Sequence, residues 1–131
     1  MRKIMATMLC LFSLFAFAAD QRSQVYTEAD KNIVVSEKQP AFTLKLKSNP
    51  TTGYVWSLSS YPADAVELVK HYFERSTSKL IGAPGYDYWL FKLKPLAFQN
   101  GHDIRIEMTY SRPWESKETA SSEVFIIKVG K

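Results

Sequence analysis

Cysteine is almost absent from this 131-residue sequence, which contains only Cys10. Cys10 lies in an apolar N-terminal segment that we expect to be removed. The remaining chain then has no disulfide framework, no thiolate nucleophile and no cysteine metal site. We therefore expect a hydrophobic core to stabilise the fold by itself, and the 14% aromatic content supplies large side chains for that core.

Histidine and catalytic motifs are also scarce. His71 and His102 are the only histidines, and we interpret each as an isolated surface residue. No histidine pair has metal-ligand spacing, and no Gly-x-Ser-x-Gly sequence exposes a nucleophile. The glycine-containing residues 82–85 lack the lysine of a phosphate-binding loop. The sequence therefore predicts a protein that is not an enzyme and that needs no metal or cofactor.

Long apolar runs are limited to residues 4–17, a segment broken by Thr7 and Ser13 and shorter than the roughly 20 residues of a membrane span. A positive start precedes it, and Ala16 and Ala18 provide the small residues that signal peptidase requires. We predict a secretory signal peptide over residues 1–19, cleaved after Ala18 or Ala19, and a periplasmic or secreted domain over residues 20–131. An uncleaved membrane anchor is the alternative.

A lipoprotein is excluded because Leu9, rather than a small residue, precedes Cys10.

Charge of one sign is not in large excess. The net charge of +4 falls to +2 when Arg2 and Lys3 are removed, which leaves 15 basic and 13 acidic residues. Nucleic-acid binding needs a basic stripe that displaces counterions, so we expect no nucleic-acid partner and no membrane partner after signal cleavage.

What the sequence does contain is alternation of apolar and polar residues, the period of a half-buried strand. The stretches that alternate are residues 42–46, 54–58, 86–94, 104–110 and 124–129. Residues 33–35 form another short strand, and residues 48–53 are expected to join two neighbouring strands. Residues 20–30 are polar and expected to be frayed, and Pro95 is expected to end the strand before it.

Residues 63–75 fit either a helix or an irregular strand, and we favour extended structure. Taken together, the pattern predicts an all-β, immunoglobulin-like β-sandwich of about seven or eight strands without a disulfide.

Three loops have unusual compositions. Loop 1 consists of Asn49, Pro50, Thr51, Thr52, Gly53 and Tyr54; loop 2 of Gly82, Ala83, Pro84 and Gly85; and loop 3 of Arg112, Pro113 and Trp114. Proline restricts φ and glycine permits positive φ, so we expect loop 1 to be stiff before anything binds. Loop 2 is expected to project as a tip small enough for a narrow slot. A loop tryptophan beside an arginine is typical of a binding hot spot.

Each loop also has an ordinary structural interpretation, because turn residues have strong local reasons to occur. Loop 2 could be only a hairpin tip, and Trp114 could fold back and cap the open end of the sandwich.

Together, the three loops resemble the signature of the chagasin family of cysteine-peptidase inhibitors: Asn-Pro-Thr-Thr-Gly-Tyr, a Gly-x-Gly-Gly-type loop, and Arg-Pro-Trp or Arg-Pro-Phe. Their order and spacing agree along nearly the whole chain after residue 19. Loops 1 and 3 are complete, and Tyr110 precedes loop 3. In loop 2, Pro84 replaces a glycine, which removes an N–H donor. We expect bacterial relatives to tolerate this form, and the chain resembles a bacterial member.

The resemblance implies that the three loops gather at one end of the sandwich and fill the cleft of a papain-like cysteine peptidase, reversibly and without a covalent bond. Thr51 and Thr52 would lie nearest the catalytic pair, loop 2 along the substrate groove, and Trp114 on the enzyme's aromatic wall. We expect the inhibitor to act as a monomer. The alternative is a periplasmic or secreted β-sandwich binding module without inhibitory activity, which would use an exposed strand edge.

Overall fold

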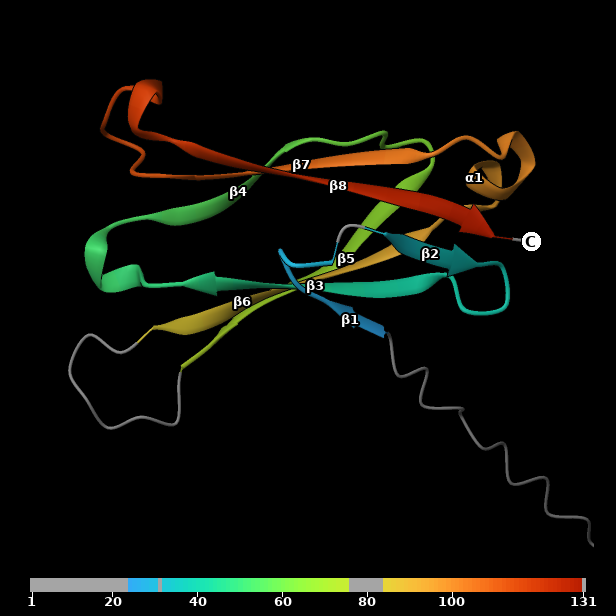
Figure 1. Cartoon of the computed structure of the whole chain (residues 1–131), viewed down its shortest axis with the longest axis horizontal. Helices are drawn as coiled ribbons and strands as arrows, with labels where there is room; N and C mark the ends of the chain where they lie inside the picture. Colours follow the sequence, from blue (N-terminus) through green and yellow to red (C-terminus); the bar gives the residue numbers. More distant parts are fainter. Residues whose placement is uncertain (1–23, 31, 76–83, 131) are drawn as a thin grey trace, which may run out of the picture.

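A computed structural model of the chain describes residues 24–30, 32–75 and 84–130. Over this part of the chain the backbone forms eight strands: β1 (Gln24–Tyr26), β2 (Ile33–Ser36), β3 (Ala41–Ser48), β4 (Val55–Ser60), β5 (Val66–Glu74), β6 (Gly85–Leu93), β7 (Ile104–Ser111) and β8 (Ser121–Gly130). They form two four-stranded sheets, β1-β3-β6-β5 and β2-β8-β7-β4, which lie face to face (Figure 1). The predicted all-β, immunoglobulin-like sandwich is confirmed.

The core lies between the two sheets and follows from the predicted alternation. In β3, Phe42, Leu44 and Leu46 are buried, whereas Lys45 and Lys47 on the other face are partly or fully exposed. Four other strands contribute their inward residues in the same way: Trp56, Trp89, Phe91, Leu93, Ile104, Ile106, Met108, Phe125 and Ile127. Each large apolar side chain that leaves water stabilises the fold by about 1.5–3 kcal/mol. The strand predictions are therefore confirmed by burial as well as by backbone.

The ambiguous residues 63–75 are resolved by β5, which pairs antiparallel with β6 and has a register shift between Leu68 and Lys70. The extended interpretation is confirmed. The bulge explains why a single alternation did not fit, since it transfers later side chains to the opposite face of the strand.

One local prediction is wrong, and a second is confirmed with an addition. Residues 24–26 are not frayed, because β1 pairs in parallel with β3, with Val25 opposite Thr43. The strand before Pro95 ends as predicted, since β6 ends at Leu93, and Pro95 also begins the helix α1 (Pro95–Asn100), which ends at Gly101 with φ of 64°. A proline is well suited to the first turn of a helix, where its missing N–H has no intrahelical partner.

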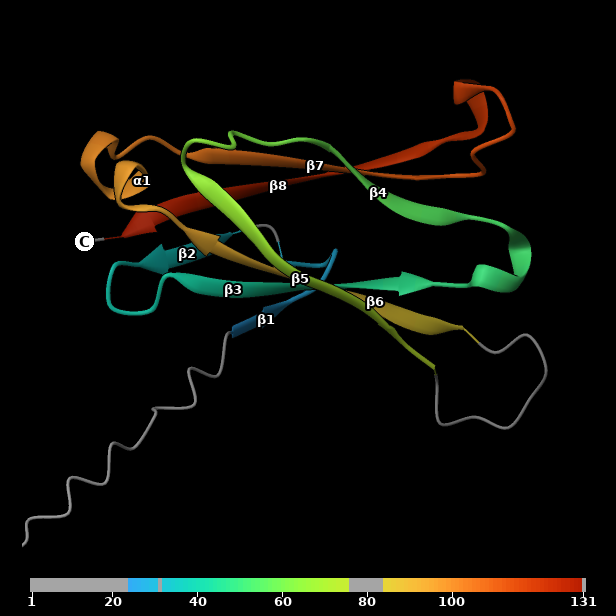
Figure 2. The ribbon, with the colours of Figure 1, turned by 180° about the vertical axis from the view of Figure 1, so that it is seen from behind.

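The link between β3 and β4 also differs from expectation. These strands belong to different sheets, so loop 1 crosses from one sheet to the other and does not close a hairpin. Seen from both sides, the β3–β4 and β7–β8 connections lie at one end of the sandwich, together with the adjoining ends of β5 and β6 (Figures 1 and 2). Helix α1 and the end of β8 lie at the opposite end.

Among the described residues, no helix is both long and apolar enough to cross a bilayer. The predicted signal peptide, residues 1–19, lies outside the described residues, as do residues 20–23 of the predicted domain.

Candidate functional site

Loop 1 is a single 3-10 turn, η1 (Pro50–Thr52), that ends in a left-handed glycine. Gly53 has φ of 83°, a conformation that side chains with a Cβ rarely adopt. The backbone N–H groups of Thr52 and Gly53 donate to the carbonyl oxygens of Asn49 and Pro50, at 3.1 Å and 3.0 Å. Proline at the start and glycine at the end are the residues that such a turn requires.

Side chains add further hydrogen bonds to the turn. The Thr51 hydroxyl donates to Oδ1 of Asn49 at 2.6 Å, and the Thr52 hydroxyl donates to the Asn49 carbonyl oxygen at 2.7 Å. Both threonines nevertheless remain exposed. These bonds agree with the predicted stiffness of loop 1, and they leave the outer faces of Thr51 and Thr52 open to solvent.

Loop 3 is tied to loop 1 by Arg112. Its Nε donates to the carbonyl oxygen of Thr52 at 2.8 Å, across 60 positions of sequence, and its guanidinium lies 4.6 Å from the ring centre of Tyr54. Such a charge-assisted hydrogen bond is among the stronger ones in proteins. The two predicted loops therefore lie side by side and are directly bonded.

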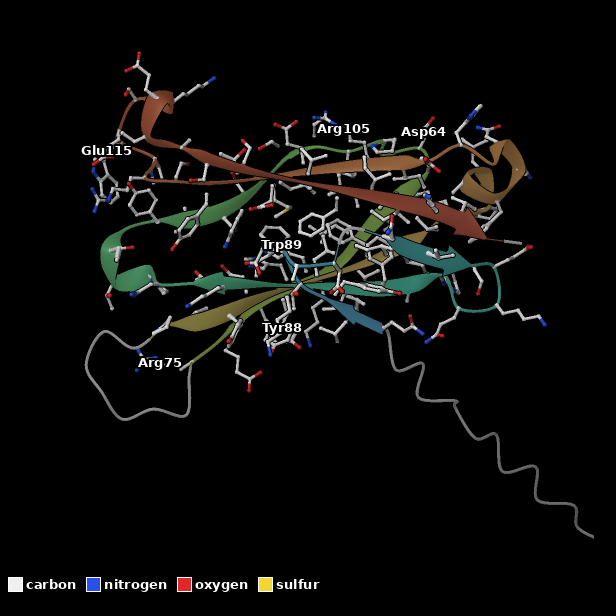
Figure 3. The ribbon with its side chains drawn as sticks, viewed as in Figure 1. Asp64, Arg75, Tyr88, Trp89, Arg105 and Glu115 are labelled. Carbon is white, nitrogen blue, oxygen red and sulfur yellow. The ribbon has the colours of Figure 1, made fainter. Side chains whose placement is uncertain are left out.

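Arg112 is in turn held by Glu115, which the sequence analysis did not include in the site. Nη1 of Arg112 donates to Oε1 of Glu115 at 2.8 Å, and the Thr119 hydroxyl, from the 3-10 turn η2 (Lys117–Thr119), donates to Oε2 at 3.1 Å. The hydrogen bond raises the pKa of Arg112 and lowers the pKa of Glu115. Figure 3 shows Glu115 at the loop end of the sandwich. The three-residue spacing of Arg112 and Glu115 was the available sequence signal.

The loops rest on aromatic rings that reach the core. The rings of Tyr54 and Tyr110 are 5.2 Å apart, and those of Tyr110 and Trp56 are 4.8 Å apart. The Tyr110 hydroxyl accepts a hydrogen bond from the backbone N–H of Asn49 at 3.1 Å. Nε1 of Trp56 donates to the carbonyl oxygen of Lys47 at 3.0 Å. The position of loop 1 is thus determined by β7 as well as by its own sequence.

Trp114 is 71% exposed, the most exposed of the large hydrophobic residues described. Its ring lies against Gly53, so it contacts loop 1 without being buried there. Trp114 therefore folds back onto loop 1 but keeps most of its ring in solvent. Its role as a hot spot stays a prediction.

Loop 2 is only partly covered by the structure. Gly82 and Ala83 lie outside the described residues, and Pro84 is exposed. Gly85 is not at a tip: it is the buried first residue of β6 and pairs with Ser48. A Cβ on Gly85 would clash with the Glu74 carbonyl oxygen and stand 2.5 Å from the ring of Phe73. The close approach of β5 therefore explains this glycine.

One of the two histidines differs from its predicted isolation. His71 lies 3.8 Å, centre to centre, from the ring of Trp89, and its Nε2 is 3.1 Å from Oδ1 of Asp87. Asp87 is 7% exposed, so His71 provides a polar partner for a buried carboxyl group. His102 is exposed, as expected. Among the described residues, no cluster of three or more His, Cys, Asp or Glu could hold a metal ion.

The chain is similar in sequence to one protein family and to two characterised proteins. Residues 36–129, which include all three loops, match the model of the Chagasin family peptidase inhibitor I42. Amoebiasin-2 of Entamoeba histolytica is 33% identical over 66% of this chain and 68% of its own length. Chagasin of Trypanosoma cruzi is 29% identical over 54% of this chain and 64% of its length, slightly less than two thirds.

Solved structures share the fold. The cysteine protease inhibitor EhICP2 from Entamoeba histolytica is similar with a TM-score of 0.58 at 23% identity, covering 76% of this chain and 96% of the other. Amebosin has a TM-score of 0.61 at 18% identity, with coverage of 82% and 98%. PbICP-C, solved in complex with falcipain-2, has a TM-score of 0.51 at 18% identity, with coverage of 82% and 89%.

Proposed function

Because the chain belongs to the chagasin family of peptidase inhibitors, we propose that it inhibits papain-like cysteine peptidases by inserting loops 1, 2 and 3 into the active-site cleft. The family match confirms the prediction that the protein is a peptidase inhibitor and not an enzyme. Its relatives include a solved cysteine protease inhibitor and one solved in complex with falcipain-2.

The observation that carries the proposal is the hydrogen bond from Arg112 to the carbonyl oxygen of Thr52, which joins loop 1 to loop 3 at one end of the sandwich. Thr51 and Thr52 in loop 1 and the indole of Trp114 in loop 3 are all exposed. An edge built from two bonded loops is already ordered before it binds. Such a surface loses little conformational entropy when it docks.

The mechanism follows from the chemistry of the target. Papain-like peptidases hold a cysteine thiolate beside a histidinium in an open groove. Thr51 and Thr52 would cover that pair, loop 2 would run along the groove, and Trp114 would pack on the enzyme's aromatic wall. The contact would be reversible and non-covalent, with no cofactor, over an interface of about 800 Å² per partner.

Inhibition assays test this proposal. Protein comprising residues 20–131 is expected to inhibit papain or a cathepsin L-like enzyme stoichiometrically. An absence of inhibition at micromolar protein across several such enzymes would contradict the target class.

The alternative is a binding module without inhibitory activity. Two variants that map the binding surface distinguish it from the proposed inhibitor. Trp114→Ala lies in loop 3, whereas Val34→Lys places a charge on the edge strand β2, where Val34 is 55% exposed. Loss of inhibition in the first variant alone supports loop insertion. Loss of partner binding in the second alone supports recognition through a strand edge.

We also propose that residues 1–19 direct export, so that the inhibitor acts in the periplasm or outside the cell, and that the chain is a bacterial member of the family. The positive start, the short apolar segment and the small residues before Asp20 support export. Pro84 in loop 2 supports bacterial origin, whereas the two curated relatives come from protozoa. Fractionation of bacteria that express residues 1–131, with N-terminal sequencing of the product, tests export. A product that retains Met1 in the cytoplasm would contradict it.

A further inference from the structure

Loop 1 must enter a peptidase active site, under the proposed function, and yet not be cut there. Three of its carbonyl oxygens accept hydrogen bonds within the protein. The Asn49 and Pro50 carbonyl oxygens accept hydrogen bonds from the turn itself, at 3.1 Å and 3.0 Å. The Thr52 carbonyl oxygen differs, because it is held by a side chain from loop 3, Nε of Arg112 at 2.8 Å.

The Thr52 carbonyl belongs to the peptide bond between Thr52 and Gly53, in the exposed part of loop 1. Thr52 is exposed, whereas Gly53 is half-buried, with the ring of Trp114 against it. Arg112 also stacks over Tyr54, the next residue but one, and is anchored by Glu115 at 2.8 Å. The guanidinium is thus held by Tyr54 and by Glu115 in addition to the carbonyl oxygen that it contacts.

Cleavage needs the scissile oxygen in a different place. The thiolate adds to the carbonyl carbon while the oxygen enters the oxyanion hole, where donors approach it to about 2.7–3.1 Å. The C–N bond then breaks as the imidazolium gives its proton to the departing nitrogen, and water hydrolyses the thioester, regenerating the thiolate. An oxygen already held by Arg112 must first leave the guanidinium before it can enter that hole.

We propose that Arg112 is a positioning residue that protects the Thr52–Gly53 bond from the peptidase that the protein inhibits, so that loop 1 is retained as an inhibitor and is not hydrolysed as a substrate. The inference rests on the proposed function and adds to it a role for loop 3 that requires no contact with the enzyme. Glu115 and Thr119 support the same role by holding the guanidinium.

The test is prolonged incubation with a catalytic amount of papain, followed by intact-mass spectrometry and N-terminal sequencing of any fragment. Wild-type protein is expected to stay intact and inhibitory. Arg112→Ala is expected to be cut to give a fragment that begins at Gly53, with inhibition lost over time. Loss of one charge-assisted hydrogen bond should speed cleavage roughly tenfold.

Arg105→Ala is the matched control. Arg105 lies on β7, the strand that leads into loop 3, and also pairs with a glutamate, Nη1 to Oε2 of Glu107 at 3.3 Å, but it contacts no carbonyl oxygen of loop 1. This variant is expected to resist cleavage as the wild type does. Cleavage of both variants at the same rate would overturn the inference, because loss of any arginine pair would then suffice.

Site-specific cleavage separates positioning from a general loss of stability. An Arg112→Ala protein that stays intact but binds more weakly overturns the inference while the proposed function stands. A wild-type protein that does not inhibit overturns both. If Arg112→Ala does not fold, the same cleavage assay is carried out on Glu115→Gln, which keeps the arginine but removes its anionic partner. Faster cutting at Thr52–Gly53 than in the wild type supports the inference, and wild-type resistance overturns it.

Discussion

The indole ring of Trp114 lies directly on Gly53: a Cβ atom at position 53 would stand 2.5 Å from Cη2 of that ring. These residues belong to loop 3 and loop 1, two motifs far apart in the sequence. Real Cβ atoms essentially never approach so closely, so only glycine allows the ring to occupy this place. The glycine of loop 1 is therefore needed for its φ of 83° and also for its lack of a side chain.

Gly53→Ala is expected to displace Trp114 and to weaken inhibition roughly fivefold, half the free-energy effect of removing the ring altogether. Gly101→Ala is the control, because Gly101 also has positive φ, 64°, but nothing lies within 4 Å of its Cβ position. Both variants should lose about 1 kcal/mol of unfolding free energy through the left-handed backbone. Inhibition constants and urea unfolding measure the two effects. Equal inhibition by both variants would contradict the role assigned to the ring contact.

Trp114→Ala is expected to weaken inhibition by about 2 kcal/mol, roughly thirtyfold, if the ring is a hot spot. Since the ring is 71% exposed, the unfolding free energy should change by less than about 0.5 kcal/mol. Tyr61→Ala, another exposed aromatic outside the loops, should change neither quantity appreciably. A lowered melting temperature with an unchanged inhibition constant would instead make Trp114 structural.

The pair of Arg112 and Glu115 predicts a pH dependence. The hydrogen bond from Arg112 is the main cause that lowers the pKa of Glu115 from its ordinary value of 4.5. Because the folded-state pKa is below the unfolded one, the pair stabilises the fold above the ordinary value. This contribution is lost as the pH falls through the lowered pKa. Wild type should therefore melt at a higher temperature than Glu115→Gln at neutral pH, and the two should converge in acid.

Melting curves of the two proteins across this pH range measure the convergence. Glu118→Gln is the control, because it removes a neighbouring carboxylate that does not contact Arg112. A difference between wild type and Glu115→Gln that stays constant into acid would show that the charge of Glu115 is not what stabilises the pair.

Tyr110→Phe is expected to reduce the unfolding free energy by about 1 kcal/mol, because the Asn49 N–H loses its acceptor while the ring stack is kept. Inhibition should weaken only several-fold, since the turn keeps its own bonds. The matched variant Tyr61→Phe should change the unfolding free energy by less than about 0.5 kcal/mol. Identical unfolding of the two variants would mean that water replaces the hydroxyl as partner of Asn49.

Much of the fold could be predicted because alternation is a local property. Phe42, Leu44 and Leu46 are buried as their spacing predicted, and the inward residues of β7 follow the same rule. Where the prediction failed, the cause was not local. Residues 24–26 form a strand because β3 offers a free edge, and Gly85 is a glycine because β5 passes close to it.

The loops of the site were predicted, but the contacts between their side chains and the rest of the protein were not. Loops 1 and 3 were identified from their motifs, but Glu115 and Thr119 were missed. The three-residue spacing of Arg112 and Glu115 was a weak signal, and a hydroxyl in a polar loop has no distinctive pattern. His71 was taken as isolated, since nothing in the sequence places Asp87 and Trp89 beside it. These neighbours come from strand pairing between β5 and β6, with the register shift included.

The sequence by itself determined the strands that alternate regularly, through the period of two in hydrophobicity, and the family, through the motifs at residues 49–54 and 112–114. The tertiary structure alone decided that β3 and β4 lie in different sheets and that Arg112 meets the carbonyl oxygen of Thr52. The physical reason is the separation in sequence over which each kind of interaction acts. Alternation and turn chemistry act over a few residues, whereas a bond across 60 positions forms only when the packing of two sheets places its partners together.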